Sequence, residues 1–206
     1  MQVIRVLGTV LFLVGLVALV ACGGGQDQAS PADADASAGD EGERYRAVVV
    51  PEGITREEAN RRAEADGGHL VTITSAEENA LVFELIAENP DIWASADITF
   101  MSEGEETPVQ LSFGPWIGYY QPPGSPEPAG GWAWVTGETS DYSNWLNQGL
   151  VDAEPNDAGG GENFGHFFSR ELDTRADTWN DLPNNPASYF AEDDFENPRG
   201  YIVEFE

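Results

Sequence analysis

Five oxygen-bearing side chains stand in two short stretches of the C-terminal half of the chain. Glu154, Asn156 and Glu162 lie in a stretch rich in Pro and Gly, and Asn180 and Asp181 directly follow a Trp. Carboxylate and amide oxygens are the ligands that calcium prefers, and one ion takes roughly 6–8 of them. If the loop and the end of a neighbouring strand meet in space, these residues would hold one calcium ion.

Acid content alone does not single these residues out. The chain has 37 Asp and Glu among 206 residues, so any loop in it would contain acids, and most of them would simply be solvated. Order and spacing are more informative. E-P-N comes first, Glu162 follows Glu154 by eight residues, and W-N-D comes last.

This order resembles the calcium and sugar site of the C-type lectin domain, in which E-P-N, a following Glu and the Asn-Asp of W-N-D hold one calcium ion. The front half agrees, because E-E-A-N-R-R-A-E-A-D-G-G-H-L-V-T-I-T-S-A-E-E-N is close to the family's first helix, G-G-H-L turn and second helix. A later W-I-G matches its central strand. The resemblance implies an α+β, C-type lectin-like fold, with two helices packed on small antiparallel sheets and a long calcium-binding loop region.

The resemblance also implies sugar binding. In the family the Pro of E-P-N, here Pro155, is cis, and calcium keeps coordination positions open for two vicinal hydroxyls of a sugar. Glu154, Asn156, Glu162 and Asn180 would contact those hydroxyls. Family members with E-P-N tend to take mannose-, glucose- or fucose-type sugars, so we expect calcium-dependent binding of a glycan or glycoconjugate.

The chain departs from the family at some positions around this site. Asp157 and Asn163 match positions that help hold an auxiliary calcium ion, but Asn163 replaces the usual Asp, so a second ion is not expected. The stretch that precedes W-N-D is longer than usual, which leaves the register of that motif open.

The family's two disulfides are also missing. Their positions fall here on Ala63 with Val203 and on Phe164 with Asn184, and Cys22 is the one cysteine in the chain. Loss of a native disulfide typically costs about 2–5 kcal/mol. Apolar packing, helped by bound calcium, would have to compensate.

The N-terminal residues indicate where the protein works. Residues 1–21 read as a lipoprotein signal peptide, because Arg5 is followed by an apolar run that is shorter than the roughly 20 residues of a membrane span and ends Leu-Val-Ala-Cys like a bacterial lipobox. Cys22 would be lipidated, and residues 22–43 would form a flexible acidic tether. We expect a lipid-anchored protein of the bacterial cell envelope, at the outer membrane or the cell surface.

Residues 44–206 are expected to form the lectin-like domain. Thr55 and Ser75, each followed three residues later by Glu, predict two capped helices that end near residues 66 and 87. The second helix is expected to turn four apolar residues inward: Val82, Phe83, Leu85 and Ile86.

Several short strands are expected in this domain. Residues 91–115 are read as an insertion, with a hairpin around 102–104 as one reading of it. Alternating or β-branched patterns predict strands, the last pairing beside the first, over 45–50, 70–73, 116–118, 132–135, 163–168, 178–181 and 200–205.

Charge and residue types narrow the function further. The formal net charge is −28 and all nine basic residues are arginines, so the surface would repel phosphate backbones, and no nucleic-acid partner is expected. No catalytic residues are expected either. Glu154 and Glu162 could be imagined as a glycosidase pair, but both are accounted for as metal ligands. The alternative to a lectin is a protein-interaction or adhesion module of the same fold, with a structural calcium ion and no sugar binding.

Overall fold

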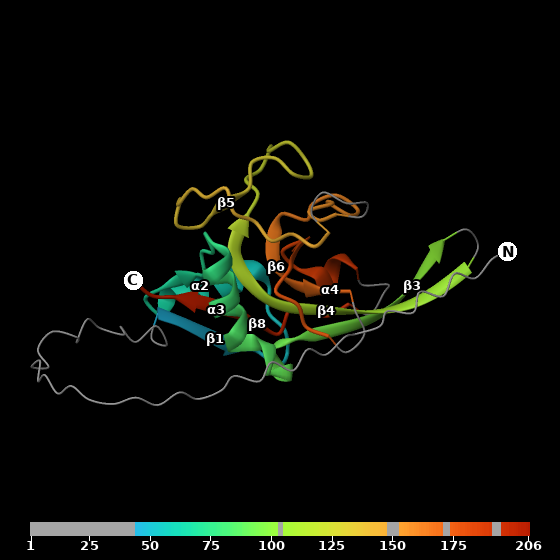
Figure 1. Ribbon diagram of the computed structural model, residues 1–206, viewed down its shortest axis with the longest axis horizontal. Helices are drawn as coiled ribbons and strands as arrows, with labels where there is room; N and C mark the ends of the chain where they lie inside the picture. Colours follow the sequence, from blue (N-terminus) through green and yellow to red (C-terminus); the bar gives the residue numbers. More distant parts are fainter. Residues whose placement is uncertain (1–43, 103–104, 148–152, 171–173, 191–194) are drawn as a thin grey trace, which may run out of the picture. The chain divides into compact units, whose positions relative to one another are not determined.

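The computed structural model describes residues 44–102, 105–147, 153–170, 174–190 and 195–206 (Figure 1). The predicted signal peptide, Cys22 and the tether lie outside the described residues. Within the described ranges, no helix is long and apolar enough to cross a membrane.

Both predicted helices are present, and each begins at its predicted cap. Helix α2 spans Arg56–Ala65 and helix α3 spans Ala76–Ala87. The hydroxyls of Thr55 and Ser75 accept from the backbone N–H three residues further on, at 3.3 and 3.1 Å. Each cap satisfies one of the N–H groups that the first turn of a helix leaves unpaired.

The strands form one connected sheet rather than separate small ones. Its order is β1-β8-β4-β6-β7, with β2 paired to β8 and both β3 and β5 paired to β4. The first and last strands pair antiparallel, as predicted, with Tyr45 opposite Glu204. The strands are β1 (Tyr45–Val49), β2 (His69–Leu70), β3 (Ala94–Ser102), β4 (Glu105–Tyr120), β5 (Ala133–Trp134), β6 (Phe164–Ser169), β7 (Trp179–Leu182) and β8 (Gly200–Glu204).

The insertion after the second helix is a long hairpin. A short 3-10 helix, η1 (Pro90–Ile92), leads into β3, which pairs antiparallel with β4 from Ala94 opposite Phe113 to Ser102 opposite Glu105. Figure 1 shows this hairpin extending away from the helices. The W-I-G strand is therefore the far end of β4 and not a separate short strand.

The predicted strands at 70–73 and 132–135 are both shorter than expected, and the first is continued by single backbone hydrogen bonds. Of residues 70–73 only Leu70 lies in a strand, β2. The next residue still bridges two strands, because Val71 donates its N–H to Ile202 of β8 at 2.9 Å and accepts from Gly118 of β4 at 2.8 Å.

The inward face of α3 differs from the prediction at one residue. Val82 and Ile86 are fully buried, whereas Leu85 is 37% exposed. A helix turns once every 3.6 residues, so Asn79 shares the face of Val82 and Ile86, and Leu85 lies outside it.

At the first of the two absent disulfides, hydrophobic packing takes the place of the bond. Ala63 and Val203, the first pair of positions that the family joins by a disulfide, are both fully buried in one hydrophobic cluster. A second cluster gathers the aromatic residues under the loops, among them Tyr119, Trp145 and Trp179.

Candidate functional site

The W-N-D motif forms the start of β7, and its register is fixed by β6. Asn180 lies opposite His166, and Asp181 lies opposite Gly165. Trp179 is fully buried and donates from Nε1 to Asn79 of α3 at 2.9 Å. The helix and the strand are thereby held together directly beside the two predicted ligands.

The E-P-N loop is tied to the same strand through its preceding segment. Glu154 donates its N–H to the carbonyl of Leu146 at 2.9 Å, and Leu146 donates its own N–H to the carbonyl of Trp179 at 2.9 Å. The Glu154–Pro155 peptide bond is cis, as the resemblance implied.

Asp181 joins the two halves of the predicted ligand set. Its Oδ1 accepts from the N–H of Asn156 at 3.1 Å, and its Oδ2 accepts from the N–H of Asp157 at 2.9 Å. The loop that carries Glu154 and Asn156 is therefore bound to the strand that carries Asn180 and Asp181.

The remaining predicted acid, Glu162, closes the loop on itself. Its carboxylate accepts from the N–H of Ala158 at 2.7 Å. Asp157, whose φ is +49°, accepts through Oδ1 from the N–H of Gly161 at 2.5 Å and of Glu162 at 3.0 Å. Asp157 thus shapes the turn between the first and the third predicted ligand.

Burial separates the five predicted residues into two groups. Glu154, Glu162, Asn180 and Asp181 are buried, at 3%, 4%, 7% and 1% exposure. Asn156 is exposed. Four of the residues thus lie in the wall or floor of the site, and Asn156 faces solvent.

The buried carboxylates also affect one another. Burial raises the pKa of Glu162 to about 9, and the negative charges of Asp181, Glu154 and Asp157 add to the shift. Burial likewise raises the pKa of Asp181 to about 6, although the two loop N–H groups lower it. Both shifts favour the neutral, protonated acid, so a bound cation would have to displace these protons.

One positive partner comes from the protein itself. Arg170 follows the last residue of β6, and its Nη2 makes an ion pair with Oε1 of Glu154. The Glu154 side chain is 1% exposed and that of Arg170 is 26% exposed. The guanidinium also lies 5.9 Å from the centroid of the Phe168 ring.

The amide of Asn180 is held in one orientation. Its Nδ2 donates to the carbonyl of Asp181 at 2.7 Å and lies 3.2 Å from Nε2 of His166. Burial lowers the pKa of His166 to about 3, so the imidazole is neutral and Nε2 accepts. Both contacts use Nδ2, which leaves Oδ1 of Asn180 as its ligand atom.

The donor chemistry of this set fits a hard cation, because every candidate ligand atom is a carboxylate or amide oxygen. The candidate ligand side chains do not all converge on one position. Among the residues that the structure describes, no group of three or more Asp, Glu, His or Cys side chains is placed to hold a metal ion. In this arrangement the acids have protein partners: Asp181 accepts from two N–H groups, and Glu154 pairs with Arg170.

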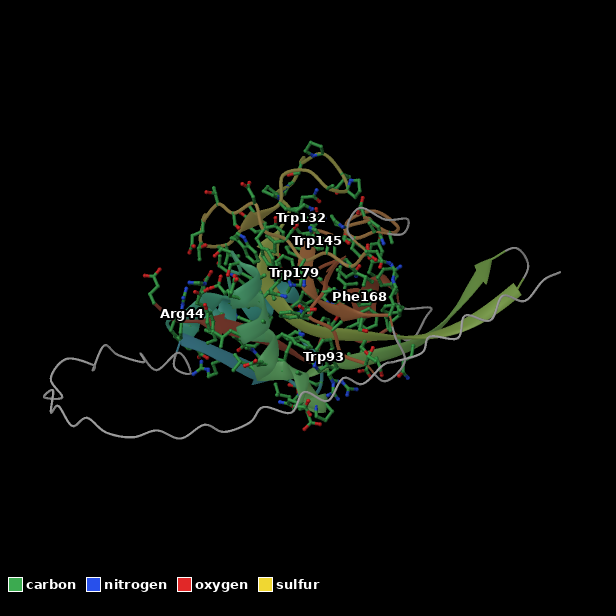
Figure 2. All side chains as sticks on the ribbon, viewed as in Figure 1. Arg44, Trp93, Trp132, Trp145, Phe168 and Trp179 are labelled. Atoms are coloured by element: carbon green, nitrogen blue, oxygen red, sulfur yellow. The ribbon has the colours of Figure 1, made fainter. Side chains whose placement is uncertain are left out.

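An aromatic cleft lies beside the E-P-N loop. Its volume is about 370 Å³, and its walls include Tyr119, Trp132, Trp145 and Pro155, with the hydroxyl-bearing Ser143. Figure 2 shows Trp132, Trp145 and Trp179 following one another from the loops towards the sheet. The ring centroids of Trp132 and Trp145 are 4.7 Å apart, and Trp132 is partly exposed.

Sequence reasoning missed two residues of this site. Tyr189 donates its hydroxyl to the carbonyls of Gly159 and Gly160 at 2.7 and 2.5 Å, which supports the tip of the loop. No motif marks this tyrosine. The sequence did contain a hint of Arg170, because this residue lies in the stretch before W-N-D that is longer than in the resembled family.

No protein-family model and no curated protein matches the sequence. Among solved structures, the chain is similar to the cow C-type carbohydrate-recognition domain of CD23, crystallised in the presence of a GlcNAc2Man3 oligosaccharide, with 21% identity over 78% of this chain and 86% of that one and a TM-score of 0.47. It is also similar to the carbohydrate-recognition domain of the mouse scavenger receptor C-type lectin, with 20% identity over 79% and 91% of the two chains and a TM-score of 0.45. A calcium-independent type II antifreeze protein matches with 20% identity over 77% and 82% and a TM-score of 0.45.

All three TM-scores are below 0.5, so the fold is judged from the elements of this chain. The predicted C-type lectin-like α+β fold is confirmed by the two capped helices, the paired terminal strands and the long loops in the second half of the chain. The names of these neighbours differ, since one mentions an oligosaccharide and another calcium independence.

Proposed function

We propose that this protein is a carbohydrate-binding module whose E-P-N loop and W-N-D strand bind a mannose-, glucose- or fucose-type sugar with the help of calcium. The observation that carries the proposal is the pair of hydrogen bonds from the N–H groups of Asn156 and Asp157 to Asp181. They join the two separate stretches that supply the candidate ligands, and they leave buried carboxylates at the junction.

Each residue has a role in this proposal. Glu154, Glu162 and Asp181 supply carboxylate oxygens, and Asn156 and Asn180 supply amide oxygens to the ion. When bound, calcium would take two sugar hydroxyl oxygens as further ligands and so orient the ring. The same hydroxyls would donate to a carboxylate and accept from an amide N–H, which makes the direction of the hydroxyl pair selective.

The aromatic cleft offers a surface for the apolar face of the sugar ring. The face of an aromatic ring carries negative charge and attracts C–H groups, and pockets of roughly 300–1,000 Å³ are typical of small-molecule sites. Trp132 is the partly exposed aromatic residue of this cleft.

Binding of mannose- and galactose-type glycans in calcium, in magnesium and in a chelator tests the proposal. We expect binding of the mannose type in calcium and none in the chelator. At ~1 mM calcium and a Kd of ~0.1 mM, chelation would also remove about 1.4 kcal/mol of stability, or about 3–6 °C in Tm. Unchanged mannose binding in the chelator would contradict the calcium-dependent mechanism.

The variant Trp132→Ala tests the contribution of the aromatic cleft to sugar binding independently of calcium binding. It should weaken sugar binding about tenfold, the scale of one lost aromatic contact, and leave calcium affinity unchanged. Leu85→Ala on α3 is the matched control, because Leu85 is exposed and lies on a different element.

A protein-interaction module of the same fold is the second candidate. The observation that favours it is the engagement of Asp181 and Glu154 by protein groups, which lets the loop hold its shape without a sugar or an ion. An empty glycan screen together with calcium-dependent stability would support this second function.

The N-terminal predictions remain part of the proposal. We infer that Cys22 carries the lipid anchor, that residues 22–43 act as a tether, and that the domain is displayed at the cell envelope. Membrane extraction of wild type and Cys22→Ser tests this, because the variant should be released without detergent.

A further inference from the structure

We propose that Arg170 is an internal counter-ion that competes with calcium for Glu154 and thereby sets the calcium affinity of the loop. This inference rests on the proposed function, since it concerns the same site. Its starting observation is the ion pair between Nη2 of Arg170 and Oε1 of Glu154.

The pair lies where a cation is needed most. The Glu154 side chain is 1% exposed, and a buried carboxylate without a positive partner is strongly destabilised. Glu154 is also the first residue of E-P-N, so the guanidinium occupies the carboxylate that the proposed ion would use. The two positive groups therefore exclude each other at this oxygen.

The position of Arg170 is set by the sheet. It directly follows Ser169, which is buried at the end of β6 and lies opposite Ser112 of β4. The guanidinium lies over the ring of Phe168, a buried residue of β6, at 5.9 Å. The arginine can therefore reach Glu154 without reorganisation of the strand.

The other carboxylates are arranged in a compatible way. Asp181 is held by two loop N–H groups and Glu162 by a third. Backbone N–H groups and one guanidinium thus stabilise the acids when calcium is scarce. The loop keeps its form, and calcium binds only when its concentration is high enough to displace Arg170.

Calcium titration of the full chain by calorimetry tests the inference, with calcium chloride as the probe. We expect Arg170→Gln to bind calcium at least tenfold more tightly than wild type. Arg175→Gln is the matched control, because it removes the same charge at an exposed residue. The Arg175 guanidinium donates to the carbonyl of Ala87 at 2.6 Å. The control should stay within threefold of wild type.

A second measurement does not depend on calcium binding. In a chelator, Arg170→Gln should melt several degrees below both wild type and Arg175→Gln, because Glu154 loses its partner. Calcium should reverse that loss. If Arg170→Gln does not fold, Arg170→Lys should bind calcium about threefold more tightly, because an ammonium cannot reproduce the guanidinium fork.

The outcomes separate this inference from the proposed function. Equal calcium affinities of wild type and the Arg170 variant would overturn the inference and leave the function standing. Calcium uptake by Arg170→Gln but not by wild type would support the inference and contradict the calcium-dependent function. Uptake by none of the three proteins would overturn both.

Discussion

At the scale of single residues, the sequence identified the acids but not what each acid contacts. Motif order placed Glu154, Glu162 and Asp181 in one region, and the hydrogen bonds from the loop to Asp181 agree with that placement. The contact between Arg170 and Glu154 could not be predicted, because it depends on where β6 ends. That end is set by pairing with β4, between residues far apart in the chain.

Glu162 gives a test of the buried acids by pH. Its pKa is raised to about 9 from 4.5, so the folded, metal-free protein binds a proton that the unfolded chain has released, and this stabilisation is lost as pH rises towards 9. His166, whose folded pKa is about 3, acts in the opposite sense below its usual value of 6.5. Between pH 6.5 and 9, the pH dependence of stability therefore reports on Glu162 without a contribution from His166.

In a chelator, we expect the Tm of wild type to fall across that window. One pKa unit corresponds to about 1.4 kcal/mol, or about 3–6 °C for a domain of this size, so a fall of at least several degrees is expected. Glu162→Gln should remove most of the slope, and Glu84→Gln, on the exposed side of α3, should keep it. A wild-type Tm that does not change between these pH values would contradict the burial argument.

At the scale of elements, the local signals predicted the helices best. Ser or Thr followed three residues later by Glu placed both helix starts correctly, because a cap depends on neighbours in the chain. Strand ends were less well predicted, as for residues 70–73, because they depend on residues far away in the chain: beyond Leu70 the backbone of Val71 is shared between β8 and β4. The inward face of α3 was misjudged at Leu85, since hydrophobicity alone does not show which side of a helix the sheet covers.

Asn79 links α3 to the strand that carries W-N-D. It is 1% exposed, accepts from Trp179 Nε1 at 2.9 Å and donates to the carbonyl of Asp177 at 3.0 Å. Asn79→Ala leaves the buried Nε1 of Trp179 without its acceptor, at a cost of about 1–3 kcal/mol in the free energy of unfolding. We also expect weaker calcium binding, because β7 loses its support.

Denaturant unfolding of Asn79→Ala measures this cost. Asn60→Ala on α2 is the matched control, because the Asn60 amide makes an exposed bond to Glu64 at 2.7 Å. The control should lose less than about 0.5 kcal/mol. Equal losses in the two variants would mean that Asn79 does not join the helix to the site.

At the scale of the whole molecule, the net charge of −28 affects both the stability of the fold and the binding of ligands. Like charges on one compact chain repel one another and destabilise the folded state, and the same field attracts cations. Salt weakens both effects, because the Debye length falls from about 30 Å at 0.01 M to about 3 Å at 1 M. The two consequences have opposite signs, so they can be measured separately.

The last prediction follows from these opposite signs. In a chelator, raising sodium chloride from low to high concentration should raise the Tm by several degrees, because self-repulsion is screened. At fixed free calcium, the same change should weaken calcium binding severalfold, because the negative surface no longer concentrates the ion. Potassium chloride is the control and should act equally, since screening depends on ionic strength and not on the identity of the ion. If the Tm stays constant while calcium affinity falls, charge repulsion does not limit the fold, and the negative surface serves cation capture alone.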